Sequence, residues 1–510
     1  MAAVGVHLGS TCACVAIYKD GRADVIANDA GDRVTPAMVA FRDSEKIVGL
    51  AAKQGRIRNA TTTVVGVKRI LGHRFEDDVV QKYISSSSCP VIEKDGYPVF
   101  SINNGTVKKH ITRHEVATLI LQKMKETALF AVGADAKDAV ITTPLNFTEQ
   151  QVDEIRQAAE SAGFNVLRIL SEPAAALLAF GIGQENSHSK CKVLVYKLGG
   201  TCADATAVEV NSGLYRVLGS VSDDTVGGEE FTDALAEYLA AEFQKFHRQD
   251  LRGNSRAMMK LHTHAEMAKH VLSTMAISNC FVDSLHDGLD FECNITRARF
   301  DSLCSALFQQ SLQPIHDLLT QINLTASDFQ KVVLCGGSAR IPKLQQLLQE
   351  QFVGSELMCS IPVDEVIALG AAAEAGILLG RDAVRFDPEA LSIECASLDI
   401  LVKEQDEAGQ DCYTVVFPVG TPLPARRQHV FQAPGTLPSV LVDVYEGVAK
   451  GSSFEGEHLA QLVLKDLQQQ ENGLRDISTV FTMKRDGSLL ITCTDQLSGT
   501  SETVTVEAAS

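Results

Sequence analysis

Two stretches of the chain share one pattern of apolar and polar positions: an apolar run, a glycine turn and a second apolar run. The first is centred on Leu-Gly-Ser-Thr-Cys-Ala at residues 8–13, and the second on Leu-Gly-Gly-Thr-Cys-Ala at residues 198–203. Apolar runs on both sides of a short glycine turn are typical of a β-hairpin. We therefore predict that one hairpin occurs twice and that the fold is organised around this repeat.

A third glycine turn follows the apolar run at residues 332–335, where Gly-Gly-Ser leads into a helix with Pro342 in its first turn. Glycine lets backbone N–H groups approach an anion, and a neighbouring hydroxyl adds a donor. A single Gly-Gly turn is more often plain structure. Three such turns in one chain, two of them copies, favour a phosphate-binding site.

The segments between the turns predict an α/β body. The sequence predicts helices at residues 113–130, 148–162, 231–239, 257–273 and 364–373, and buried strands at residues 139–144 and 166–170. The second strand delivers Glu172 to a strand end, where open α/β folds keep their ligands. A charge at a helix start, favoured by the helix dipole, explains Glu172 equally well.

The pattern changes near residue 381. Helical spacing nearly vanishes, and short alternating runs predict strands at residues 413–417, 440–445, 459–464, 479–483, 489–494 and 502–506. Many short strands separated by turns are typical of a β-sandwich. We therefore expect an α/β body followed by a smaller β module.

Composition limits the partners and the cellular location that we expect for this protein. The 510 residues are 45% hydrophobic and 22% charged, with a formal net charge of −18, which disfavours direct contact with nucleic acid or an anionic membrane. The N-terminal residues lack the pattern of a signal peptide, so we expect a cytosolic protein. The 13 cysteines are scattered and predict reduced thiols; Cys12 and Cys14 fit small core residues better than a metal or redox pair.

These motifs, in this order, resemble those of the heat-shock protein 70 (DnaK-type) family. The resemblance is most specific at residues 164–176, 332–343 and 418–424. It implies an actin-like, two-lobed nucleotide-binding domain at residues 1–382, a linker at 383–393 and a β-sandwich substrate-binding-like domain at 394–510, without a helical lid. Within the family the chain is most similar to the heat-shock-70-like (Ssz-type) subunit of the ribosome-associated complex, the partner of a zuotin-type J-domain protein.

The resemblance also implies a site for ATP or ADP. Its phosphates would lie among Gly9, Ser10, Thr11, Gly199, Gly200, Thr201, Gly227 and Gly228; adenosine would lie beside Glu266, Lys269 and Ser273; and Gly336, Gly337, Ser338 and Arg340 would contact the nucleotide, with Asp364 nearby. Lys68 matches the family's catalytic lysine, and Glu172 matches the glutamate near metal-bound water. Both would be vestigial if hydrolysis is lost.

Two departures affect this chemistry. Where the family has aspartate in the two hairpins, this chain has His7 and Lys197, which leaves Asp204 as the one candidate metal ligand. Mg²⁺ prefers carboxylate oxygen and water, so its binding is in doubt. Lys197 would instead place a point cation near the phosphates. We expect nucleotide binding with slow or negligible hydrolysis; the alternative is that both changes are neutral.

The linker sequence also departs from that of the family. Residues 384–391 have little of the acidic, leucine-rich character of the family linker, which puts allosteric coupling in doubt.

Three functions remain open. The first is an ATP-binding subunit that works with a J-domain protein and, through it, with ribosomes and nascent chains. The second is an independent ATP-hydrolysing chaperone, and the third is a small-molecule kinase on the same actin-like body.

Overall fold

The computed structural model describes residues 3–19, 22–42, 45–103, 108–132, 136–183, 191–211, 214–380, 396, 398–405, 411–419, 421, 425–450, 453–467, 473–484 and 487–507. The chain divides into two compact units, Met1–Asp382 and Ala383–Ser510. The linker expected at residues 383–393 lies outside the described residues. No helix in the described part of the chain is long and apolar enough to cross a membrane.

The first lobe of the first unit is built on a six-stranded sheet in the order β12-β11-β1-β2-β3, with β4 paired to β2. Its strands are β1 (Ala3–Leu8), β2 (Cys12–Lys19), β3 (Arg22–Val25), β4 (Thr35–Pro36), β11 (Asp138–Thr143) and β12 (Asn165–Ser171). β1 and β2 form the first predicted hairpin, and β11 pairs in parallel with β1.

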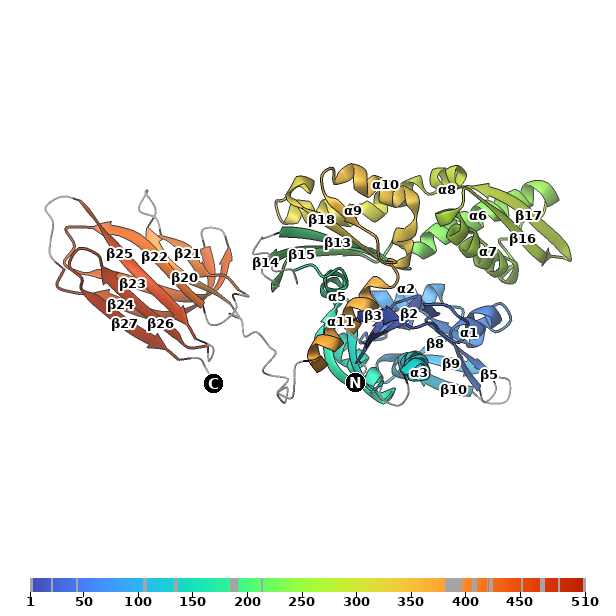
Figure 1. The fold of residues 1–510 in the computed structure, drawn as a ribbon, viewed down its shortest axis with the longest axis horizontal. Helices are drawn as coiled ribbons and strands as arrows, with labels where there is room; N and C mark the ends of the chain where they lie inside the picture. The colour runs from blue at the N-terminus through green and yellow to red at the C-terminus, as the bar shows by residue number, and fades with distance from the viewer. Residues whose placement is uncertain are drawn as a thin grey trace. The chain divides into compact units, whose positions relative to one another are not determined.

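The second lobe repeats this plan in a five-stranded sheet with the order β15-β14-β13-β18-β19. Its strands are β13 (Cys191–Leu198), β14 (Ala203–Asn211), β15 (Leu214–Asp223), β18 (Lys331–Cys335) and β19 (Glu356–Met358). The hairpin β13–β14 corresponds to β1–β2, and β18 pairs in parallel with β13. The two hairpins confirm the repeat predicted from the sequence, and the two-lobed arrangement confirms the actin-like fold that the family resemblance implied (Figure 1).

Helices surround the two central sheets. They are α1 (Leu50–Gly55), α2 (Asp78–Ser86), α3 (Arg113–Val132), α4 (Glu149–Ser161), α5 (Glu172–Ala179), α6 (Gly228–His247), α7 (Ser255–Thr274), α8 (Arg297–Leu303), α9 (Ser305–Gln321), α10 (Pro342–Gln351) and α11 (Val366–Gly380). Short 3-10 turns lie at η1 (Ala60–Thr62), η2 (Val67–Ile70), η3 (Ala326–Asp328) and η4 (Gly337–Arg340). Thr148 and Gln151 form a capping box at the start of α4, the helix predicted at residues 148–162.

Three small sheets lie outside the central ones. They contain β5 (Met38–Arg42), β6 (Glu45–Val48) and β7 (Thr63–Val65); β8 (Val91–Lys94), β9 (Tyr97–Asn103) and β10 (Lys108–Thr112); and β16 (Ile277–His286) with β17 (Leu289–Thr296). Each lobe has its own apolar core, one around β1 and α3 and the other around β13, α6 and α9. The two central sheets therefore belong to two separately packed lobes, and each lobe fixes the position of its own strand ends.

The second unit is a β-sandwich. Its sheets have the orders β21-β20-β23-β24 and β22-β25-β26-β27. The strands are β20 (Asp399–Gln405), β21 (Asp411–Phe417), β22 (Ala425–Pro434), β23 (Val440–Lys450), β24 (Ser453–Leu464), β25 (Leu474–Met483), β26 (Leu489–Asp495) and β27 (Ser501–Val506). Inward side chains of both sheets, such as Val442 and Phe481, form one core. Every helix in the described residues belongs to the first unit.

Candidate functional site

The first two glycine turns have the same backbone geometry. The N–H of Gly9 donates to the carbonyl of Cys12 at 2.9 Å, and the N–H of Gly199 donates to the carbonyl of Cys202, also at 2.9 Å. The repeat therefore extends from sequence to hydrogen bonding. One detail differs from the prediction: Cys14 is buried, but Cys12 is exposed at the turn and is not a core residue.

The turns of the two lobes lie directly against each other. A Cβ atom added to Gly200 would stand 2.3 Å from Cγ2 of Thr11, so only glycine allows this approach. The N-terminus of α6 joins them, because a Cβ atom at Gly228 would stand 2.2 Å from Oγ of Ser338. That hydroxyl donates to the carbonyl of Gly199 at 2.9 Å. The predicted phosphate residues are thus brought together on one surface.

The first two turns keep backbone donors available. Within the residues that the structure describes, the amides of Ser10, Thr11, Gly200 and Thr201 donate to no backbone carbonyl. Successive free amides at glycine turns form a concave anion site. The turns therefore fit the phosphates of a nucleotide.

The third turn completes this surface. Gly336 has φ of 82°, and its N–H donates to the carbonyl of Val363 at 2.7 Å. A side chain there would meet the carbonyl oxygen of Leu198 at 2.3 Å, so the position requires glycine. Arg340, at the end of the turn, forms an ion pair with Asp364. Both predicted residues therefore lie beside the third turn.

The residues predicted to flank adenosine lie on α7. The Nζ atom of Lys53, from the first lobe, stands 2.7 Å from Oε2 of Glu266, so this ion pair joins the two lobes. Lys269 is buried and donates to the carbonyl of Gly228 at 2.5 Å. Ser273 donates to the carbonyl of Lys269 at 3.2 Å. Glu266 is thus positioned at the boundary between the lobes, and Lys269 reaches the start of α6.

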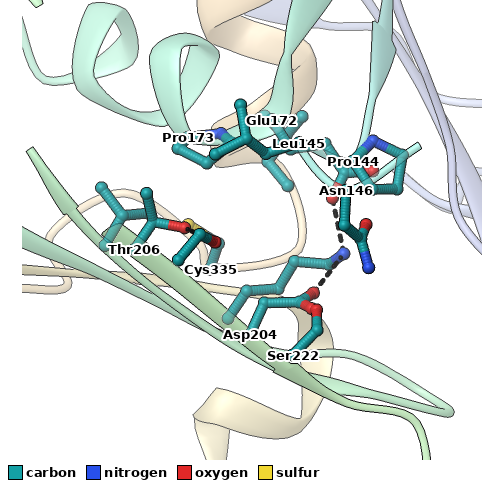
Figure 2. A pocket seen from close by; sticks show the side chains of 13 residues that line it. Pro144, Leu145, Asn146, Glu172, Pro173, Asp204, Thr206, Ser222 and Cys335 are labelled. Atoms are coloured by element: carbon teal, nitrogen blue, oxygen red, sulfur yellow. Dashed lines mark hydrogen bonds and ion pairs between the residues drawn. The ribbon is translucent and has the colours of Figure 1, made fainter. Parts of the chain in front are cut away.

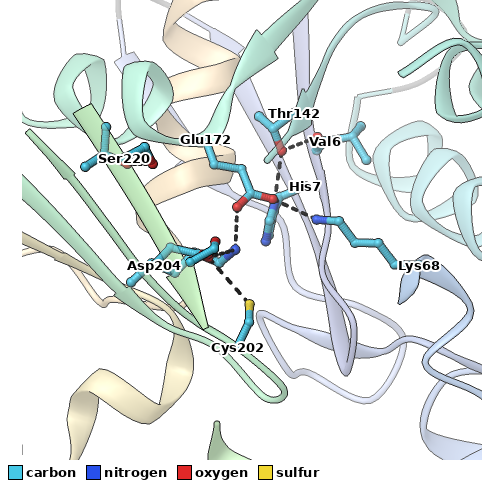
Figure 3. A network of polar contacts seen from close by, with 11 residues as sticks. Val6, His7, Lys68, Thr142, Glu172, Cys202, Asp204 and Ser220 are labelled. Atoms are coloured by element: carbon cyan, nitrogen blue, oxygen red, sulfur yellow. Dashed lines mark hydrogen bonds and ion pairs between the residues drawn. The ribbon is translucent and has the colours of Figure 1, made fainter. Parts of the chain in front are cut away.

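A buried ionic network lies below the first two turns. Nζ of Lys68 stands 2.7 Å from Oε1 of Glu172, and Nζ of Lys197 stands 2.5 Å from Oε2 of the same carboxylate. Lys197 also stands 3.0 Å from Oδ2 of Asp204. Figure 3 shows Glu172 with Asp204 on one side and Lys68 on the other. The Lys197 ammonium pairs with both carboxylates. Lys68 and Glu172 come from the first lobe and Lys197 and Asp204 from the second, so the network also joins the lobes.

Neighbouring charges fix the protonation of this network. Burial alone would raise the pKa of Glu172, but the ammonium groups of Lys197 and Lys68 hold it well below its usual range. Burial opposes the charge of Lys197, but Asp204, Cys202 and Glu172 hold its pKa well above the usual value. Burial lowers the pKa of Lys68, and the Glu172 carboxylate counteracts it. Two ammonium groups therefore face two carboxylates.

His7 lies beside this network as a neutral ring. Burial, reinforced by Lys68 and Lys197 and opposed by Glu172, lowers its pKa from 6.5 to about 3. Its Nδ1 atom lies 2.9 Å from Oγ1 of Thr142, within hydrogen-bonding distance, and 3.8 Å from Oε1 of Glu172. An uncharged imidazole thus occupies the position where the sequence resemblance leads one to expect a carboxylate.

A pocket reaches the network from one side. It is lined by Pro144, Leu145, Asn146, Glu172, Pro173, Val195, Lys197, Asp204, Thr206, Ser220, Ser222, Cys335 and Ile367. Figure 2 shows Asp204 and Ser222 on one side of this pocket and Pro144, Leu145 and Asn146 on the other. The charged side chains of this lining are Lys197 and its two carboxylate partners, Glu172 and Asp204.

A divalent cation does not fit this arrangement. The Lys197 ammonium already lies within hydrogen-bonding distance of both carboxylates that face the pocket. In the described part of the chain, no group of three or more His, Cys, Asp or Glu side chains is placed to hold a metal ion. Asp204 therefore serves as an ion-pair partner of Lys197.

The structure also shows site residues that the sequence did not point to. Thr142 holds His7, Ser222 donates to Oδ1 of Asp204, and Lys53 pairs with Glu266. Thr142 and Ser222 lie near the ends of β11 and β15, and a strand-end hydroxyl is a weak signal by itself. Lys197 was expected beside the phosphates, but its carboxylate contacts became evident only from the fold.

Comparison with known proteins defines the class. The family model described as Hsp70 protein matches residues 3–510, so the chain belongs to the Hsp70 family. It is an Hsp70-family chaperone, and members of this family bind ATP or ADP. The glycine turns described above are consistent with that ligand.

Several curated relatives match the chain along its whole length. It is similar to heat shock 70 kDa protein 14-A of Xenopus laevis, with 58% identity over 509 residues that cover 100% of both chains. It is 57% identical to heat shock 70 kDa protein 14 of Danio rerio over 509 residues, covering 100% of this chain and 99% of the relative. Heat shock 70 kDa protein 14 of Homo sapiens is 57% identical over 510 residues, covering 100% of both.

Proposed function

We propose that this chain is an atypical Hsp70-family subunit that holds ATP or ADP as a structural ligand, hydrolyses ATP slowly or not at all, and assists the folding of nascent polypeptides at the ribosome together with a zuotin-type J-domain protein. The observation that carries the proposal is the Lys197 ammonium, which lies 2.5 Å from Glu172 and 3.0 Å from Asp204. It pairs with the two carboxylates that would otherwise be free to organise a metal ion and its water.

Hydrolysis of ATP depends on positioning water and on neutralising charge at the transferred phosphoryl group, usually through a metal ion. In this site both oxygens of Glu172 accept from ammonium groups, one from Lys68 and one from Lys197. That carboxylate is therefore engaged in ion pairs and poorly suited to orient water. Nucleotide binding through the glycine turns is independent of this loss.

The same loss of hydrolysis supports a J-domain protein as the partner. An Hsp70-type subunit that does not cycle its nucleotide cannot drive client release by itself, so it has to act through another chaperone. The net charge of −18 disfavours direct binding to ribosomal RNA. Contact with the ribosome through a J-domain protein satisfies both points, and it agrees with the Ssz-type resemblance in the sequence.

Single-turnover hydrolysis tests the enzymatic part of the proposal. The full chain is mixed with radiolabelled ATP, with and without the J-domain protein, and product formation is followed. We expect bound ATP to persist under both conditions. Hydrolysis at the rate of a cycling Hsp70, measured in parallel as the control, would contradict the proposal.

Affinity capture from cytosol at native salt tests the partner. We expect ribosomes and a J-domain protein in the bound fraction, and we expect ribosomes to be lost when the J-domain protein is depleted first. Capture of unfolded clients that ATP releases, without ribosomes, would instead show an independent chaperone.

One observation favours that second function. Lys68 and Glu172 keep a direct ion pair at 2.7 Å, so the pair that the family uses near the reacting phosphate is retained. An independent ATPase would require Lys197 to leave both carboxylates when nucleotide and metal bind. The hydrolysis experiment above distinguishes the two functions.

A further inference from the structure

We propose that the site selects the nucleoside polyphosphate free of Mg²⁺, with the Lys197 ammonium in the place of the divalent ion, so that Mg²⁺ weakens binding of the nucleotide. The inference rests on the proposed function, because it specifies the ionic form of the same ligand. It concerns the sign of the Mg²⁺ effect, which the loss of hydrolysis alone does not determine.

The first argument is the charge of the site. Two ammonium groups, of Lys68 and Lys197, are matched by the carboxylates of Glu172 and Asp204, and the His7 ring is neutral. The formal charges of these five side chains therefore sum to zero without a metal ion. Aspartate at positions 7 and 197 would change this sum by three negative charges, and a divalent cation would then be needed to bring phosphates close.

The second argument is that the carboxylate oxygens have partners. Oε1 of Glu172 accepts from Lys68, and Oε2 accepts from Lys197. Oδ2 of Asp204 accepts from Lys197 and from the Cys202 thiol, and Oδ1 accepts from Ser222. Mg²⁺ demands near-octahedral oxygen ligands at short distances. To coordinate these oxygens it would have to compete with a buried ammonium group at three of them and with the Ser222 hydroxyl at the fourth.

The third argument is the supply of donors for phosphate. An ammonium group has three N–H donors, and Lys197 uses two of them for carboxylates. One N–H donor remains on Lys197, and the amides of Ser10, Thr11, Gly200 and Thr201 donate to no backbone carbonyl among the described residues. The site thus offers N–H donors to bare phosphate oxygens. When Mg²⁺ coordinates the phosphate oxygens, it neutralises part of their charge, and their attraction to the Lys197 ammonium is weaker.

The test is equilibrium binding of ATP to the full chain, measured by calorimetry in EDTA and at increasing Mg²⁺ with ionic strength held constant. If only free ATP binds, the apparent Kd rises as the uncomplexed fraction falls, by about tenfold when a tenth of the ATP is free. An equal Kd across the series, or tighter binding with Mg²⁺, would overturn the inference. Absence of binding under every condition would instead refute the proposed function, so the two failures are distinguishable.

Two variants link the effect to Lys197. Lys197→Asp should reverse it, so that ATP binding becomes tighter when Mg²⁺ is added. Lys197→Met removes the charge without adding a carboxylate and should weaken binding in EDTA at least about tenfold, because a charge-assisted contact to phosphate is lost. A Mg²⁺ response identical to that of the unmodified chain in both variants would overturn the assignment.

Lys192→Asp is the matched control. Lys192 lies on the same strand, β13, and the substitution changes the net charge of the chain by the same amount away from the network. It should keep the Mg²⁺ response of the unmodified chain. Thermal unfolding of each variant without nucleotide shows whether it is folded before binding is compared.

Discussion

At the scale of single residues, the site is defined by two exchanged side chains and the contacts they make. Lys197 pairs with a carboxylate from each lobe, and His7 is buried against Thr142. A charged imidazole at position 7 would face the ammonium groups of Lys68 and Lys197 in a dry environment. The neutral ring avoids that repulsion, and it makes the stability of the protein depend on pH.

We predict that this dependence is carried by His7. Its pKa is about 3 in the folded chain against 6.5 for an unperturbed ring, because burial disfavours the cation. Between these values the unfolded chain binds the proton more readily, so the stability that His7 contributes is complete above pH 6.5 and declines as pH falls toward 3. The decline should approach about 1.4 kcal/mol for each pH unit.

Urea unfolding of the chain and of His7→Asn, from about pH 7 to about pH 5, measures this slope. Asparagine does not titrate and still reaches the Thr142 hydroxyl, so the variant should have a shallower slope. His110→Asn, at an exposed position of β10, is the control and should keep the slope of the unmodified chain. Equal slopes for all three proteins would show that His7 is not responsible.

At the scale of elements, the site depends on how closely helices approach the central strands. A Cβ atom added to Gly370 of α11 would stand 1.7 Å from the carbonyl oxygen of Ala175 in α5. These two helices are tightly packed, and α5 begins with Glu172. The close approach therefore helps to fix the carboxylate that both lysines contact.

We predict that Gly370→Ala destabilises the chain by about 1–3 kcal/mol, because the backbone of one helix has to move. Helix propensity alone would favour alanine by about 1 kcal/mol, so the sign of the change is informative. The control is Gly253→Ala, where an added Cβ meets nothing within 4 Å. Denaturant midpoints measure both variants, and a stabilised Gly370→Ala would refute the packing argument.

Elements whose periodicity or turn chemistry is local were predictable from the sequence. The two hairpins, the helix that starts at Thr148 and the helix opened by Pro342 were all predicted and are present. The helix α2 and the strands β20 and β22 were missed. α2 ends in serines, which are weak helix formers, and half of the residues of β22 are polar, with several positions exposed.

The candidate site was predictable only in part. The glycine turns are visible in the sequence because they repeat, and the exchange at positions 7 and 197 is visible through the resemblance to the family. The pairing of Lys197 with Glu172 joins strand β13 to the start of α5, which come from different lobes. Such a contact is set by tertiary packing, and no local pattern in the sequence carries it.

At the scale of the whole molecule, the chain consists of two compact units with separate cores. Every residue of the glycine turns and of the ionic network belongs to the first unit. The second unit has its own buried ion pair, between Arg475 and Asp495, whose side chains are fully buried. Stability in the two units is therefore set by different groups.

We predict that ATP raises the unfolding transition of the first unit alone. A ligand at 100 times its Kd stabilises the unit that binds it by about 2.7 kcal/mol. The linker sequence lacks the leucine-rich character on which coupling in the family depends, so little of this energy should reach the β-sandwich. Scanning calorimetry in EDTA, with and without ATP, should show one shifted and one unchanged transition.

Asp495→Asn assigns the transitions. The substitution removes the charge that pairs with the buried Arg475 guanidinium, and it should lower the transition of the β-sandwich by an amount equivalent to about 3–5 kcal/mol. The transition that ATP shifts should stay in place. If ATP raised both transitions, or restored the one lowered by Asp495→Asn, the nucleotide would be coupled to the β-sandwich and the chain would retain the communication between units that its linker sequence argues against.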